Sequence, residues 1–442
     1  MNTRQWLTER VARLRGPAPV AVRPTQERLK ARLRQGEEAM TPRALRQKLD
    51  ELRAIVDPLV SEVEGGRRAG VVIGWYAGAS PAHRRDLWLL MSESFVADQQ
   101  QVRAAQEQYL AAVGTPDEAA AEVLYRRATV SPRRRLLQRF SAHRDGIPFL
   151  VNLRAEMQPL LKADRRLLAL DVEMEYMFST WFDVGFLELR RISWDSPASL
   201  VEKLIKYEAV HDIRSWDDVK NRLDSDRRCY GFFHPRLPGE PLIFVEVALA
   251  QQMAGSIAPL LDEHAAPVDL DRATTAIFYS ISNTQAGLRG VSFGDSLIKR
   301  VVESLHEEFP RLKTFATLSP IPGLRAWLGR YAPAELLQAW DTAGELAEKS
   351  PARLALLQWT ARYLARELQD GKPADAVARF HLGNGARVER LNWAADLSPK
   401  GLRQSYGLMV NYLYDLRKLD RNRAALAQGK VPVAPAIRDL CA

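Results

Sequence analysis

Cysteine is almost absent from this sequence, which has only Cys229 and Cys441 among its 442 residues. Two cysteines so far apart exclude a disulfide framework, and equally a cysteine zinc site, as the feature that organises the fold. A reducing compartment is therefore expected. Cys229 is predicted to be an ordinary buried apolar residue.

Long apolar runs are missing as well. The best candidate, residues 242–250, contains Glu246 and is far shorter than the roughly 20 residues that a membrane span needs. The N-terminus has no apolar secretory segment, and its arginines suit either a transit peptide or, given Glu9 and Glu27, a plain helix, which we favour. The chain ends in Asp-Leu-Cys-Ala and lacks the peroxisomal tail Ser-Lys-Leu. We expect a cytoplasmic protein with no membrane partner.

Several functional motifs are absent too. The sequence contains no HExxH zinc motif and no GxxxxGK[ST] phosphate loop, and it has neither zinc-finger spacing nor an RNA-binding aromatic motif. The net charge of +9, from 63 basic and 54 acidic residues, permits a nucleic-acid partner but equally suits a polyanionic small molecule. We predict no metal and no nucleic acid.

The composition, 46% hydrophobic and 26% charged, is typical of a folded protein, and the length predicts at least two domains. Residues 1–188 are predicted to form a helical domain, with residues 1–40 a helix plus a mobile arm. A serine or threonine followed by a proline marks the start of a helix at three places. These pairs are Thr41-Pro42, Thr115-Pro116 and Ser131-Pro132. The segment 165–190 also has a helical pattern.

Residues 189–442 alternate between strand and helix patterns, which predicts an α+β fold with a mixed sheet flanked by helices. Strands are expected at 229–233, 242–250, 275–282 and 312–318. Helices are expected at 194–211, 333–369 and 399–427. Residues 377–382 and 387–393 are predicted to form a hairpin around Asn384-Gly385, the strongest two-residue turn signal.

The stretch 276–302 carries the clearest functional signal. A β-branched and aromatic run is followed by three glycines, Gly287, Gly290 and Gly294, and then by a helical apolar stripe. A strand, a glycine turn and a helix N-terminus together present free N–H groups to an anion. An ordinary strand-to-helix turn also uses glycine, so both interpretations stay open. The stripe consists of Leu297, Ile298, Val301, Val302, Leu305 and Phe309.

Ser319 and His381 are the candidate chemical groups. Ser319 ends a predicted strand before Pro320 and Pro322, which fix the backbone, although a serine before proline is also a common helix cap. His381 is predicted to follow a strand, and its ordinary pKa suits proton transfer, although a lone histidine beside a turn is usually unremarkable. His234, beside Pro235, is interpreted as structural.

Four segments resemble the malonyl-CoA decarboxylase family and occur in that family's order between residues 192 and 414. They are FYSISNTQAGLRGVSFGDSLIKRVV, HPRLPGEPLIFVEVALA, TFATLSPIPG and FHLGNGA. The resemblance implies a catalytic domain with the fold of GCN5-related N-acetyltransferases over residues 189–442, behind a helical domain that takes part in a homo-oligomer. That fold binds the coenzyme A pyrophosphate with R/Q-x-x-G-x-G/A. Arg289 and Gly294 fit the pattern, whereas Ser292 replaces its middle glycine.

The resemblance also implies the reaction, which is the decarboxylation of malonyl-CoA to acetyl-CoA without a cofactor. It makes Ser319 and His381 the catalytic residues. Asn411 and Tyr414, expected on a C-terminal helix, become candidates for the malonyl pocket, although an ordinary helix face explains them equally well. The pyrophosphate would be held by Arg289, Gly290, Val291, Ser292, Phe293, Gly294 and Asp295.

Two other functions remain compatible with these residues. One is an acyltransferase that uses the same coenzyme A loop to acylate an amine. The other is a non-catalytic module in which a degenerate coenzyme A site acts as a sensor, or in which the basic surface binds nucleic acid. Release of carbon dioxide from malonyl-CoA without an acceptor would separate decarboxylation from both.

Overall fold

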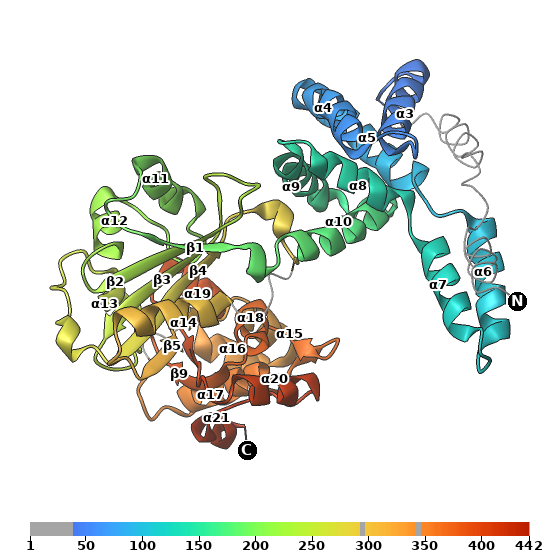
Figure 1. The fold of residues 1–442 in the computed structure, drawn as a ribbon. Coiled ribbons are helices and arrows are strands. Elements are labelled where there is room, and N and C mark those ends of the chain that lie inside the picture. Colours follow the sequence, from blue (N-terminus) through green and yellow to red (C-terminus); the bar gives the residue numbers. More distant parts are fainter. Residues whose placement is uncertain (1–38, 292–296, 342–345, 442) are drawn as a thin grey trace, which may run out of the picture. The chain divides into compact units, whose positions relative to one another are not determined.

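The computed structural model describes residues 39–291, 297–341 and 346–441. The chain divides into two compact units between Met177 and Phe178, inside helix α10 (Leu168–Trp181) (Figure 1). The sequence-based boundary after residue 188 falls at the start of strand β1 (Glu188–Ile192). The helix and arm predicted for residues 1–40 lie almost entirely outside the described residues.

The first unit is all-helical over its described part, as predicted. Thr41 and Ser131 cap α3 and α8 with their hydroxyl oxygens, and a proline follows each of them. At the Thr115-Pro116 pair the helix instead begins at Glu118. The helices before α10 are α3 (Pro42–Val56), α4 (Glu62–Gly78), α5 (Pro81–Ser94), α6 (Gln99–Ala112), α7 (Glu118–Thr129), α8 (Pro132–Ala142) and α9 (Gly146–Met157).

The second unit is built on a mixed sheet with strand order β1-β2-β3-β4-β5-β10-β6, in which β9 also pairs with β10. Its neighbouring strands are antiparallel except β4 and β5, which are parallel. This arrangement confirms the predicted fold class. The remaining strands are β2 (Arg227–Phe233), β3 (Pro241–Ala250), β4 (Thr275–Asn283), β5 (Thr314–Thr317), β6 (Ser319–Pro320), β9 (Arg387–Asn392) and β10 (Met409–Leu413), with a separate pair β7 (Leu368–Gln369) and β8 (Lys372–Pro373).

Helices cover both faces of this sheet (Figure 1). On one face, Arg222 of α12 contacts Glu246 of β3. On the other, Arg228 of β2 contacts Glu308 of α14. The helices of this unit after α10 are α11 (Ala198–Tyr207), α12 (Trp216–Arg222), α13 (Ala258–Leu261), α14 (Leu297–Glu308), α15 (Leu324–Tyr331), α16 (Ala334–Trp340), α17 (Pro351–Arg366), α18 (Ala376–Gly383), α19 (Pro399–Ser405), α20 (Leu419–Ala427) and α21 (Pro435–Leu440).

Three local predictions were wrong. The hairpin expected at 377–393 is helix α18 followed by β9, because Asp375 accepts the N–H groups of Val377 and Ala378 and starts a helix there. The helix expected at 399–427 is interrupted by β10, because α19 ends at Tyr406, whose φ of 54° is left-handed. The segment 165–190 contains α10 but ends in β1.

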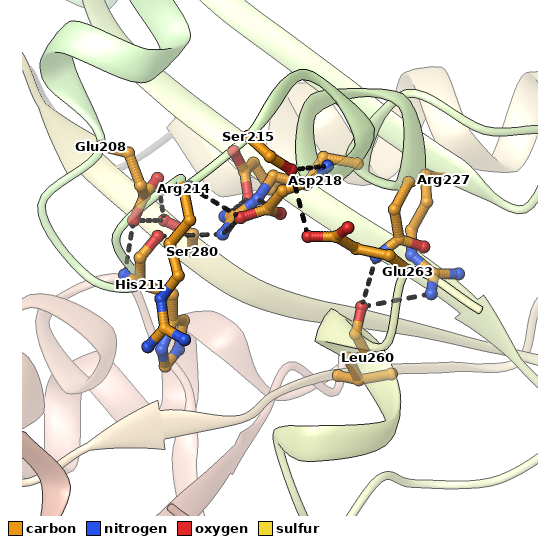
Figure 2. Close-up of polar contacts among 12 residues, drawn as sticks. Glu208, His211, Arg214, Ser215, Asp218, Arg227, Leu260, Glu263 and Ser280 are labelled. Carbon is orange, nitrogen blue, oxygen red and sulfur yellow. Dashed lines mark hydrogen bonds and ion pairs between the residues drawn. The ribbon is translucent and has the colours of Figure 1, made fainter. Parts of the chain in front are cut away.

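A buried polar network joins α11 and α12 to the sheet (Figure 2). Arg222 donates to Asp218 at 2.7 Å and to Glu246 at 2.9 Å. Glu208 accepts hydrogen bonds from the hydroxyls of Ser280, at 2.8 Å, and Ser282, at 3.2 Å. Because these groups are already paired with one another, we interpret the network as structural.

Replacing Glu246 with glutamine is expected to flatten the pH dependence of stability. Burial, with the nearby Glu208 charge, raises the pKa of Glu246 from 4.5 to about 7 despite Arg222. The folded protein therefore holds this proton more tightly than the unfolded chain, so stability falls as pH rises from about 4.5 to 7. The wild type should lose about 3 kcal/mol over this interval that Glu246→Gln does not lose.

Urea unfolding at pH 5 and pH 7.5 measures this difference. Because the wild type is compared with the variant at each pH, titrating groups that do not interact with Glu246 cancel. Parallel pH profiles for the two proteins would contradict the prediction.

Candidate active site

Ser319 lies in the two-residue strand β6, opposite Val410 of β10. Its side chain is buried, and the following residues Pro320 and Pro322 restrict the backbone as expected. The helix after this turn, α15, begins at Leu324. Ser319 is therefore not the cap of that helix, which removes the alternative interpretation of the serine-proline pair.

His381 lies beside Ser319. Its Nε2 atom is 3.2 Å from Ser319 Oγ, and its Nδ1 atom is 2.7 Å from the hydroxyl of Tyr414. The imidazole also stacks on Tyr412, with ring centroids 4.7 Å apart. The prediction that His381 follows a strand was wrong, since it lies in the last turn of α18. The sheet and this helix nevertheless bring three of the predicted residues and Tyr412 into one buried cluster.

Asp375 ties the two halves of this cluster together. One carboxylate oxygen caps α18, which carries His381, and the other accepts the N–H of Gly323 at 3.2 Å, in the turn after Ser319. A side chain at Gly323 would place its Cβ 2.3 Å from the Tyr363 hydroxyl, so only glycine allows this approach. One carboxylate therefore holds both the turn that follows Ser319 and the helix that carries His381.

The cluster is uncharged at neutral pH. Burial lowers the pKa of His381 to about 3, so its imidazole is neutral. Burial also raises the pKa of Tyr414 well above its usual value, so its phenol keeps its proton. A negative charge brought next to the ring would favour imidazolium and oppose this desolvation.

Thr317 is a member of this cluster that the sequence did not reveal. Its Oγ1 accepts hydrogen bonds from the Ser319 hydroxyl at 2.8 Å and from the Tyr412 N–H at 3.0 Å. The available signal was a second hydroxyl two residues before Ser319, which strand alternation places on the same side.

Asn411 makes no hydrogen bond to the side chains of Ser319 or His381 among the described residues, and its place in the malonyl pocket stays a prediction. Its amide donates to the carbonyls of Thr317 and Ala254, and its oxygen accepts from Arg390 and Asn392. These four bonds use the full capacity of a side-chain amide. Asn411 is in β10, not in a helix, and it supports the sheet at this point.

The predicted anion loop is only partly described. Arg289 is exposed, Gly290 has a left-handed φ of 84° that favours glycine, and Val291 is buried. Ser292, Phe293, Gly294 and Asp295 lie outside the described residues. The strand before the loop and the helix after it are present as β4 and α14, and α14 buries Leu297, Ile298, Val301, Val302 and Leu305, as predicted.

The Ser319–His381 cluster lies on the sheet face that α14 covers. Phe278 of β4 contacts Tyr414 and is paired with Val247, which in turn pairs with Arg228. Directly paired residues share a face, and Arg228 contacts α14 through Glu308. The loop that precedes α14 therefore leads to the same face of the sheet as the cluster.

The other candidates are distant or inert. His234 follows β2, four positions from β10 in the sheet, and its Nδ1 accepts the N–H of Arg236. Cys229 is buried, and burial raises the pKa of its thiol. Among the described residues no group of three or more histidine, cysteine or acidic side chains could hold a metal ion.

Comparison with known families decides the family of this chain. A family model described as the malonyl-CoA decarboxylase C-terminal domain matches residues 185–442, and one described as the N-terminal domain matches residues 95–182. The chain belongs to the malonyl-CoA decarboxylase family. The family identified from the four sequence segments is thereby confirmed, and with it the carboxy-lyase class of this enzyme.

Two curated malonyl-CoA decarboxylases, both named as mitochondrial, match most of the chain. The protein of Anser anser anser is 35% identical over 402 residues, covering 81% of this chain and 80% of that protein. The protein of Rattus norvegicus is 36% identical over 396 residues, covering 79% and 80%. The expected cytoplasmic location therefore stays a prediction. No helix in the described part of the chain is long and apolar enough to cross a membrane.

Solved malonyl-CoA decarboxylases have the same fold as this chain. The enzyme from Rhodopseudomonas palustris has a TM-score of 0.80 at 40% identity, with 89% of this chain and 99% of that chain covered. The enzyme from Agrobacterium vitis has a TM-score of 0.80 at 39% identity, with 90% and 100% covered. The similarity to these decarboxylases thus extends over nearly the whole length of both chains.

Proposed function

We propose that this chain decarboxylates malonyl-CoA to acetyl-CoA and carbon dioxide, with Ser319 and His381 handling the proton and without a metal or organic cofactor. The observation that carries the proposal is the Ser319–His381 pair, joined at 3.2 Å in a buried cluster of a malonyl-CoA decarboxylase family member. The cluster shares a sheet face with the helix that follows the predicted coenzyme A loop, which supports the same proposal.

Decarboxylation of the malonyl group requires few protein groups. The bond between the carboxylate carbon and C2 of the malonyl group breaks, carbon dioxide leaves, and the electron pair becomes a thioester enolate. The thioester carbonyl already delocalises this pair, so no additional electron sink is required. A proton must then reach C2, and one proton from water restores the enzyme after each turnover.

Ser319 and His381 suit the proton delivery. The Ser319 hydroxyl would hydrogen-bond the malonyl group, and the imidazole behind it would supply the proton. The free site keeps His381 neutral, but the bound carboxylate and the forming enolate both favour its protonated form. The protonated imidazole is then populated when the substrate is present, and the empty site keeps His381 neutral.

The coenzyme A portion is proposed to bind at the loop between β4 and α14. Gly290 supplies the left-handed turn, and the pyrophosphate would lie near the N-terminus of α14, where a helix favours negative charge. Arg289 and the residues that follow it would complete the contacts. We also propose a homo-oligomer, on the family resemblance alone.

The test is incubation of the purified protein with malonyl-CoA and no acceptor. Equal amounts of carbon dioxide and acetyl-CoA are expected, with the same rate after treatment with a chelator. Thiol release that depends on an added amine, without carbon dioxide, would instead identify an acyltransferase. Tight binding of malonyl-CoA without turnover would identify a non-catalytic module.

A further inference from the structure

Thr317 determines which way the Ser319 hydroxyl points. Thr317 is fully buried at the end of β5, and its Oγ1 accepts both the Tyr412 N–H, at 3.0 Å, and the Ser319 O–H, at 2.8 Å. The Tyr412 N–H belongs to strand β10, so the acceptor is anchored to the sheet. Its position is therefore set by the backbone of two neighbouring strands.

The direction of this hydrogen bond decides the tautomer of His381. Serine has a single hydroxyl proton, and Ser319 gives it to Thr317, so toward His381 Nε2 the serine oxygen can only accept. Nε2 must then carry the hydrogen. A neutral imidazole has one N–H, so Nδ1 accepts the hydroxyl proton of Tyr414.

We propose that Thr317 is a positioning residue that keeps His381 in the Nε2–H form and so directs the proton from His381 to Ser319. The inference rests on the proposed decarboxylation for its kinetic consequence. With substrate bound, the Ser319 hydroxyl leaves Thr317 and gives its proton to C2 of the enolate, while the imidazolium passes its Nε2 proton to Ser319 Oγ. One N–H bond breaks and one C–H bond forms. The imidazole is left neutral with its hydrogen on Nδ1, and a proton from water returns to Nε2 before the next cycle.

The same arrangement disfavours a nucleophilic role for the serine. A nucleophilic serine gives its proton to the neighbouring histidine, which then acts as base. Here the Ser319 hydroxyl proton points away from His381, toward Thr317. His381 presents the hydrogen on its Nε2 atom to the serine oxygen. The geometry suits proton donation to a carbanion and not the formation of an acyl-enzyme.

The first test is the tautomer in the free wild-type protein. Labelling with [15N]histidine gives seven imidazoles, and the His381 signals are those that disappear in His381→Gln. We expect nitrogen shifts of the Nε2–H form. An Nδ1–H signal for His381 in the wild type would overturn the proposal without any change at Thr317.

The second test is Thr317→Val, which keeps the shape but removes the acceptor. Ser319 is then free to donate to Nε2, so the His381 signals should change to the Nδ1–H form. Turnover should fall about tenfold or more, because a Ser319 hydroxyl that donates to Nε2 is turned away from accepting the proton of His381, while KM stays within about twofold. Thr317→Ser restores the hydroxyl and is expected to recover both the tautomer and most of kcat.

Thr360→Val is the matched control. Thr360 is as fully buried as Thr317, in α17 of the same unit, and its hydroxyl bonds the Leu356 carbonyl at 2.7 Å. We expect the His381 tautomer and the kcat of the Thr360→Val variant to equal those of the wild type. An Nε2–H tautomer or a wild-type kcat in folded Thr317→Val would refute the role of Thr317. Since the tautomer is measured without substrate, a wild type that releases no carbon dioxide would disprove only the proposed function.

Discussion

Replacement of His381 with alanine is expected to slow the release of carbon dioxide from malonyl-CoA by on the order of 100-fold or more. Among the described residues, the imidazole is the only titratable side chain that is hydrogen-bonded to Ser319. Without it the enolate must take its proton from water. The loss should appear in kcat, because the proton is needed after the substrate has bound.

His234→Ala is the control for this prediction. His234 is also buried and its pKa is also lowered by burial, but it lies beyond β2, where it bonds the backbone of Arg236 and Trp181 and packs on the ring of Phe182. We expect near wild-type turnover from the folded His234 variant. Near-normal turnover in His381→Ala would remove that residue from the mechanism.

Replacement of Ser319 with alanine is expected to cause a comparable loss, also on the order of 100-fold. Ser319 connects His381 to the place where the malonyl group must lie, so its removal breaks the same proton path. The double variant should therefore be little slower than either single variant, because residues that act as a unit are not additive. Mass spectrometry of the wild type during turnover should detect no acyl-enzyme.

Ser405→Ala serves as the matched control for the serine. Ser405 is buried in the same unit, and its hydroxyl bonds the Leu408 carbonyl at 2.6 Å. Its loss is expected to lower stability and leave kcat unchanged. Independent, multiplicative losses in the Ser319 and His381 variants would show that the two residues do not share one step.

The buried strands could be predicted because their residues are apolar in nearly continuous runs. Strands β2, β3 and β4 are covered on both faces, so the positions 229–233, 242–250 and 275–282 carried a strong local signal. The apolar face of α14 was equally clear. In each of these elements, the apolar pattern within the segment itself predicts which residues are buried.

The region around His381 could not be predicted in the same way. Asn384-Gly385 has the sequence of a hairpin turn, but Asp375 caps a helix that runs up to it. Strand β10 pairs with β5, β6 and β9, which lie far from it in sequence, and its residues alone suited a helix. In both places a contact with a distant segment outweighed the local preference.

The sequence by itself determined the family, the order of helical and sheet regions, and the identity of Ser319 and His381 as candidates. Only the tertiary structure decided that Tyr414 bonds the imidazole, that Thr317 receives the serine proton and that Asn411 belongs to the sheet. The physical reason is that these roles depend on hydrogen-bond direction between side chains from β5, β6, β10 and α18. Such directions exist only once the segments have packed together.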